Sequence, residues 1–144
     1  MSAAAVVERA ANMTSSEPIV FQGIDHVQLA APPGSEAEGR RFFGELLGLT
    51  ELPKPAPLAA RGGLWFQCGL QQIHIGSEQD FRPARKAHPA LRLRDEASLQ
   101  ALRARLSAVG VATRDDREIE DVARFFAEDP WGNRLEFVAS RAGR

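Results

Sequence analysis

The residues best suited to chemistry in this sequence are three histidines and one glutamate. A shift of 62 positions carries His26 onto His88 and His74 onto Glu136, and the chain has no other histidine. Imidazole nitrogens and carboxylate oxygens bind zinc, nickel, cobalt, manganese and ferrous iron, and the ligand type alone does not choose among these ions. The spacing therefore predicts one divalent metal ion, held by a set of residues that belong to two equivalent halves of the chain.

The same shift relates much of the remaining sequence without a gap, which indicates an internal repeat. It places apolar residues on apolar residues and glycine on glycine. The matched pairs include Leu29 with Leu91, Gly48 with Gly110, and Leu64 with Phe126.

Alternation of apolar and polar residues predicts strands at corresponding places in the two halves. They cover residues 24–30, 64–68 and 71–76 in the first half and residues 88–94, 122–127 and 134–139 in the second. Prolines at positions 53, 55 and 57 exclude a helix and a central strand there, so the stretch after Thr50 is predicted to be an edge strand or an extended loop.

Each half is also predicted to carry one helix after its first strand. The first helix follows Ser35, a candidate N-cap, and ends before Gly48, and the second ends before Gly110. The apolar stripes are Phe42, Phe43, Leu46 and Leu47 in the first helix and Leu99, Leu102, Leu106 and Val109 in the second.

The predicted strands place all four candidate ligands on the faces away from the helices. His74 stands between two isoleucines, and Glu136 between a leucine and a phenylalanine. Because successive side chains of a strand point to opposite faces, these apolar neighbours pack on the helix layer and the two candidate ligands leave it. The same argument applies to His26 and His88, so all four side chains are expected to converge on one side.

With this plan the sequence resembles the vicinal oxygen chelate superfamily of glyoxalases, bleomycin-resistance proteins and extradiol dioxygenases, over about residues 22–140. The segments that carry the resemblance are GIDHVQLA, RRFFGELLGL, QQIHIG, HPALRL and DPWGNRLEFV. It implies an α+β fold in which two tandem βαβββ modules, at about 22–78 and 86–140, have curved mixed sheets that enclose a cleft, with the helices outside. It also implies a homodimer, in which the cleft lies within one chain or between two.

The resemblance further implies that His26, His74, His88 and Glu136 occupy the metal positions of the family. Glu136 and His74 are the candidate catalytic residues, because Glu136 could act as ligand or base and His74 as a proton acceptor near neutral pH. If only His26, His88 and Glu136 bind the ion, His74 lies beside the ligands or carries a proton and is not itself a ligand. The histidine at position 74 departs from bacterial glyoxalase I, which has a glutamate there.

Four other residues on the predicted inner face are candidates for substrate binding. Gln28 and Gln72 could form hydrogen bonds with a substrate or orient a metal ligand. Arg92 and Arg134 would be costly to bury unpaired, and a substrate carboxylate or Glu136 would satisfy them. Trp65 and Phe66, by contrast, are expected to serve packing on the two sides of their strand.

Composition narrows the classes of partner. The 144 residues carry a net charge of -1, which does not favour nucleic acid, and the sequence offers no membrane span. A single cysteine, Cys68, excludes an intrachain disulfide and fits the cytoplasm. Residues 1–18 are predicted to be a flexible tail, and residues 19–144 a single glyoxalase-like domain.

Two function classes follow. The first is a small metal-dependent enzyme of lyase, isomerase, transferase or dioxygenase type, in which the ion polarises neighbouring oxygen atoms of a small substrate. The alternative is a metal-free protein that binds or sequesters a small molecule, as the bleomycin-resistance proteins do. Such a protein has no need of histidine at the ligand positions, and this favours the enzyme.

Overall fold

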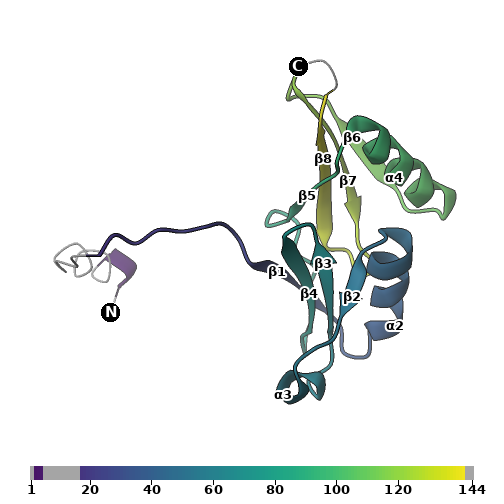
Figure 1. Cartoon of the computed structure of the whole chain (residues 1–144). Coiled ribbons are helices and arrows are strands. Elements are labelled where there is room, and N and C mark those ends of the chain that lie inside the picture. Colours follow the sequence, from purple (N-terminus) through teal and green to yellow (C-terminus); the bar gives the residue numbers. More distant parts are fainter. Residues whose placement is uncertain (1, 5–16, 142–144) are drawn as a thin grey trace.

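The computed structural model describes residues 2–4 and 17–141, and within them the chain forms two four-stranded mixed sheets (Figure 1). Each sheet has a helix packed on one face. The predicted α+β fold of two tandem βαβββ modules is therefore confirmed. Most of the predicted flexible tail, residues 5–16, lies outside the described residues, so the domain limits stay a prediction.

The first module contains the first sheet, in which the strand order is β1-β4-β3-β2. Strand β1 runs parallel to β4, and the other neighbours are antiparallel. Its elements are β1 (His26–Ala31), α2 (Glu36–Gly39), η1 (Arg40–Leu46), β2 (Thr50–Leu52), α3 (Ala56–Ala59), β3 (Leu64–Cys68) and β4 (Gln71–Ser77).

The second module repeats this arrangement with the strand order β5-β8-β7-β6. Strand β5 runs parallel to β8, and the other neighbours are again antiparallel. Its elements are β5 (Ala90–Arg92), α4 (Glu96–Ala108), β6 (Thr113–Asp116), β7 (Val122–Glu128) and β8 (Arg134–Ser140).

Both predicted helices form, and their ends follow local chemistry. Gly48 and Gly110 adopt φ angles of 76° and 80°, the left-handed conformation that ends a helix and that glycine adopts without strain. The first helix begins directly after Ser35 as predicted, but the hydroxyl of Ser35 donates to the carbonyl of Pro32 and makes no capping bond to the helix. In the second module, Asp95 does cap its helix α4, by accepting from the backbone N–H of Ser98 at 2.7 Å.

Two predicted details of the helices are wrong. The prolines were expected to exclude helix from residues 53–57, yet the single turn α3 contains Pro57. Proline is tolerated in the first turn because its missing N–H would have no partner there in any case. Val109 was placed in the apolar stripe of α4, but it follows the end of that helix and is 63% exposed.

The hydrophobic core lies between the helices and one face of each sheet. Aromatic residues of both elements interlock in the first module, where Phe43 stacks on Phe66 with ring centroids 5.8 Å apart. The second module has the same layers. Buried side chains of that layer are Leu99, Leu102, Leu106, Phe125, Leu135 and Phe137.

The turn between β7 and β8 joins the two modules. The Asn133 side chain is buried there, and its amide donates to the Ala30 carbonyl at 2.8 Å while its oxygen accepts from the Ala84 N–H at 2.9 Å. Trp131 of the same turn stacks on Phe43 at 6.3 Å. The modules are thus held together through their helix side and this turn, while the two sheets stay open and do not close into one barrel (Figure 1).

Among the described residues no helix is long and apolar enough to cross a bilayer.

Candidate functional site

The face of each sheet that is turned away from its helix is called here the open face. On the first sheet this face carries a stack of three rings. His74 on β4 lies between His26 and Trp65, with ring centroids 4.1 Å and 4.2 Å away and interplanar angles of 14° and 6°. His74 is only 5% exposed although it points away from the helix layer, because these two rings cover both of its faces. The imidazole of His74, a candidate ligand, is therefore largely shielded from water on this open face.

The surroundings of His74 keep its imidazole neutral. Burial lowers the pKa of His74 below its usual value, and the neighbouring His26 lowers it further. Its Nε2 atom lies 2.9 Å from the side-chain oxygen of Gln72. His26 is more exposed, and its Nδ1 lies 2.8 Å from the Asp25 carboxylate. Neutral imidazole is the form that binds a metal ion or accepts a proton.

The open face of the second sheet carries the other two candidate ligands in direct contact. His88 Nε2 lies 3.0 Å from Glu136 Oε2. His88 Nδ1 lies 2.9 Å from the backbone carbonyl of Lys86, to which it can only donate. This bond leaves Nε2 as the nitrogen available to a metal ion, on the side where Glu136 stands. The geometry fits a pair of ligands for one ion.

Sequence reasoning missed Arg124, which is central to the second open face. Its guanidinium lies 3.2 Å from the Glu136 carboxylate and 3.1 Å from the Asp116 carboxylate. Burial by itself would lower the pKa of Arg124, but the hydrogen bonds with these two carboxylates raise it. The predicted strand 122–127 contained the signal, since Arg124 alternates with residues of the apolar face.

Aromatic residues that the prediction assigned to packing, or used only as repeat markers, lie beside the candidate ligands. Trp65 pairs with His74 across β3 and β4, and Phe126 pairs with Glu136 across β7 and β8. Phe126 meets the His88 ring edge-on at 5.7 Å, and the guanidinium of Arg114 covers its face at 4.6 Å. Each open face thus has a flat aromatic wall, whereas Phe66 packs in the core as expected.

The registers show how far the repeat extends into the structure. Gln28 pairs with His74, and Ala90 pairs with Glu136, which is the predicted shift of 62 positions. The strands β3 and β7 are offset by one residue from that shift, because the partner of His74 is Trp65 and the partner of Glu136 is Phe126. The gapless match of Leu64 with Phe126 is therefore wrong, since Leu64 is a core residue.

The four candidate ligands, expected to converge on one side, form two separate pairs within the described chain. His26 and His74, called here the first pair, lie on the first sheet. His88 and Glu136, the second pair, lie on the second sheet. Among the described residues no group of three or more histidine, cysteine, aspartate or glutamate side chains is placed to hold a metal ion. Each pair offers two of the side chains that a metal site needs.

The predicted substrate-binding residues are distributed over both sheets. Gln72 contacts His74, and Gln28 lies on the same face, over the space left by Gly76. Arg92 is exposed on the edge strand β5, and Arg134 stands opposite Glu128 in the register of β8 and β7. The predicted ion pair with Glu136 exists, but Arg124 makes it.

Comparison with solved structures finds a close relative. A glyoxalase family protein from Bacillus anthracis is 47% identical, with a TM-score of 0.82, and the match covers 87% of this chain and all of that chain (100%). No protein-family model matches the sequence, and a search of curated proteins finds no match.

Two more distant structures share the fold. Lactoylglutathione lyase from Agrobacterium tumefaciens is 17% identical with a TM-score of 0.67, over 83% of this chain and 94% of that chain. The antibiotic-binding protein TnmS3 from Streptomyces sp. CB03234 is 18% identical with a TM-score of 0.65, over 85% of this chain and 99% of that chain.

Proposed function

Because the chain belongs to the glyoxalase family of the vicinal oxygen chelate superfamily, we propose that it is a metal-dependent enzyme that polarises neighbouring oxygen atoms of a small substrate. The observation that carries this proposal is the equivalent placement of the two pairs. All histidines of the chain, together with Glu136, lie on the open faces of the two sheets. Surface histidines with no shared function would have no reason to follow the repeat.

We propose that one divalent ion is held by the first pair of one copy and the second pair of another copy. His26 and His74 supply two imidazoles, and His88 and Glu136 supply a third imidazole and a carboxylate. Two features support a homodimer: each open face carries only half of the donors, and the sheets of one chain do not close around a common cleft. Zinc, nickel, cobalt, manganese and iron all accept these donors.

When bound, the ion would stabilise negative charge that develops on a substrate oxygen. The protein residues would position the substrate and move a proton. His74 is kept neutral by burial. Its Nε2 faces the Gln72 side-chain oxygen, to which it can only donate, so Nδ1 is the atom that can accept a proton, and Glu136 is the other candidate base. Trp65 and Phe126 would confine a flat substrate between them, and the proposed reaction is of lyase, isomerase, transferase or dioxygenase type.

Arg92, Arg134, Gln28 and Gln72 remain our proposed substrate-binding residues. The two glutamines line the open face beside the first pair. Arg92 and Arg134 stand on the strands that carry or flank Glu136, where an anionic group of a substrate would meet them.

A second candidate function is metal-free binding of a small aromatic molecule. The three-ring stack and the Arg114 guanidinium over Phe126 favour it, because both surfaces suit stacking. The likeness to an antibiotic-binding protein in fold agrees with this candidate. In that case an aromatic ligand would still stack on these residues in protein that binds no divalent ion.

Metal analysis of paired variants tests the proposed enzyme. Wild-type protein purified without a tag should contain about one divalent ion per chain, and His26→Ala and Glu136→Ala should each lose it, whereas the exposed control Glu128→Ala should keep it. When the two deficient variants are unfolded together and refolded, each mixed dimer regains one intact site. The mixture should then recover about a quarter of the wild-type metal content.

Each outcome of this experiment is informative. No recovery on mixing would show that both pairs of a site come from one chain and would overturn the shared site. Wild-type protein that binds no divalent ion, and whose melting temperature no divalent ion raises, would overturn metal dependence and leave the metal-free binding protein as the function.

A further inference from the structure

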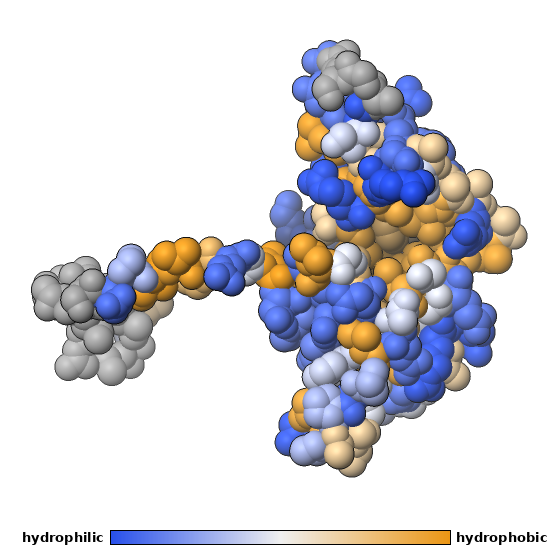
Figure 2. All heavy atoms as spheres, viewed as in Figure 1, coloured by the Kyte–Doolittle hydropathy of each residue, from blue (hydrophilic) through white to orange (hydrophobic). Residues whose placement is uncertain are grey.

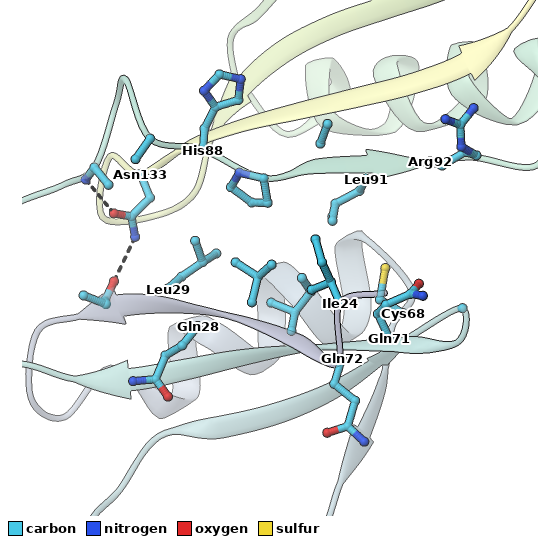
Figure 3. A pocket seen from close by; sticks show the side chains of 18 of the residues that line it. Ile24, Gln28, Leu29, Cys68, Gln71, Gln72, His88, Leu91, Arg92 and Asn133 are labelled. Atoms are coloured by element: carbon cyan, nitrogen blue, oxygen red, sulfur yellow. Dashed lines mark hydrogen bonds between the residues drawn. The ribbon is translucent and has the colours of Figure 1, made fainter. Parts of the chain in front are cut away.

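A large apolar groove separates the two modules. It has a volume of about 1230 Å³ and lies between the edge strands β1 and β5. Figure 3 shows that Ile24, Leu29 and Leu91 point toward one another across the gap. Cys68 and Leu93 also line it. This groove between β1 and β5 is thus lined by side chains that water solvates poorly.

The groove is separate from the open faces that carry the metal-binding pairs. In Figure 3, Gln28 and Gln72 point away from the gap on one side, and His88 points away on the other. His88, Arg92 and the two glutamines are among the residues that line the groove, but its apolar part is formed by helix-facing residues of β1 and β5 such as Leu29 and Leu91. An apolar ligand of this part would therefore differ from the substrate of the proposed enzyme.

Both strands beside the groove have an unpaired backbone edge. In the two sheets β1 pairs only with β4, and β5 pairs only with β8. An unpaired edge offers N–H and C=O groups to any extended segment that lies along it. The groove therefore suits an extended, apolar peptide.

The chain itself presents such a peptide. Residues 17–25, called here the arm, have no regular secondary structure, and they project away from the body (Figure 1). Ile19, Val20 and Phe21 are 82%, 74% and 89% exposed, and they form an apolar surface along the arm in Figure 2. Large apolar side chains this exposed stabilise a protein only when something covers them.

We propose that the arm of one copy lies in the groove of a second copy. The arm joins the body at Gly23 and Ile24, which themselves line the end of the groove, so two copies that approach there can exchange arms. Gly23, where the arm meets the body, has a φ angle of 136°, and from there the arm extends away from the groove of its own chain (Figure 1). Exchange about a twofold axis would bury both arms and fill both grooves. This inference rests on the proposed function only in that both involve a second copy.

Cys68 provides a direct probe of the groove, because it lines the groove and is the only cysteine. The experiment measures how fast a maleimide labels Cys68 in the full chain at several protein concentrations. We compare wild type with the double variant Val20→Asp and Phe21→Asp. Val109→Asp, which changes an exposed apolar residue far from the arm, is the matched control.

In wild type, labelling should slow by at least about tenfold as the protein concentration rises and the arms dock. The arm variant should be labelled at one fast rate at all concentrations, and sedimentation should show a weaker dimer, whereas Val109→Asp should behave as wild type. Equal labelling of wild type and the arm variant would overturn the inference. Slow labelling of wild type that does not depend on concentration would also overturn it, because the arm would then occupy its own groove.

The metal content of the same samples separates this inference from the proposed function. If wild type binds its ion but the arm variant leaves Cys68 labelling and the dimer unchanged, the docked arm is wrong and the enzyme proposal stands. If wild type binds no ion but labelling follows the expected pattern, the reverse holds.

Discussion

Trp65 lies flat against His74, with ring centroids 4.2 Å apart and an angle of 6° between the planes. His26 covers the opposite face of the same imidazole at 4.1 Å. A ring enclosed in this way is poorly hydrated when it is charged, so the stack favours neutral His74. Trp65 therefore prepares His74 for metal binding or for proton transfer, although its residue type alone suggested packing.

Removing the indole should release His74 from this constraint. In Trp65→Ala the imidazole gains water on one face, so the pKa of His74 should rise toward its usual value. NMR titration of the histidine side-chain signals measures this change, with His74→Gln to assign the signal. Trp65→Phe keeps a ring in place and should retain most of the depressed pKa. An unchanged pKa in Trp65→Ala would show that other contacts keep His74 neutral.

The depressed pKa of His74 also predicts a pH dependence of stability. Because the folded protein holds this group neutral, the unfolded chain binds more protons between the folded and the usual pKa. The contribution of His74 is thus complete above the usual pKa of about 6.5 and decreases as the pH falls below it. Urea unfolding of metal-free protein between pH 8 and 5 should show this loss of stability, and His74→Gln should reduce it. An equal loss in His74→Gln would assign the pH dependence to other groups.

Arg124 should matter for stability as well as for the site. It connects two carboxylates, at 3.2 Å to Glu136 and 3.1 Å to Asp116, and its side chain is only 15% exposed. In metal-free Arg124→Met both carboxylates lose a partner, so the free energy of unfolding at pH 7 should fall by about 1–3 kcal/mol in urea titrations. A bound divalent ion should reduce this loss, because the ion takes over the charge of Glu136.

Arg114→Met is the matched control for this prediction. Arg114 also covers Phe126, at 4.6 Å, but it is exposed and contributes a cation–π contact of about 0.5–1 kcal/mol or less. Equal losses in the two variants would mean that the ion pairs of Arg124 do not stabilise the fold.

The elements of the fold were predictable because their signals are local. Alternation placed β3 at the residues 64–68 that the structure shows, and Gly48 and Gly110 marked the ends of both helices. The resemblance to the vicinal oxygen chelate superfamily is confirmed by the close relative. The one-residue offset of β3 and β7 escaped prediction, because the loop lengths before and after these strands compensate each other over the repeat.

The arrangement of the site was less predictable. Alternation shows which face of its own sheet a side chain leaves, and it placed His74 and Glu136 away from the helices, as the structure does. It does not show how two sheets are oriented, so the separation of the two pairs could not be foreseen. The roles of His26, His74, His88 and Glu136 stay a prediction.

Asn133 holds the two modules together and should be the most sensitive position of their junction. Its side chain is 1% exposed and forms three hydrogen bonds, to the carbonyl of Ala30 (2.8 Å), the N–H of Ala84 (2.9 Å) and the carboxylate of Asp129 (2.7 Å). Asn133→Ala removes all three bonds, two of them to backbone groups of other segments, so the free energy of unfolding should fall by about 2–4 kcal/mol. Glu128→Ala, which breaks only an exposed ion pair nearby, should cost less than about 1 kcal/mol.

Hydrogen exchange locates the effect of Asn133→Ala within the molecule. The backbone N–H of Ala84 should exchange faster in this variant, because its acceptor is gone, whereas amides in the centre of β4 and β8 should change only as much as global stability does. If Ala84 keeps its protection and stability falls by less than 1 kcal/mol, about the cost of the control, the modules are held by the contact of Trp131 with Phe43 and the other helix-side contacts instead.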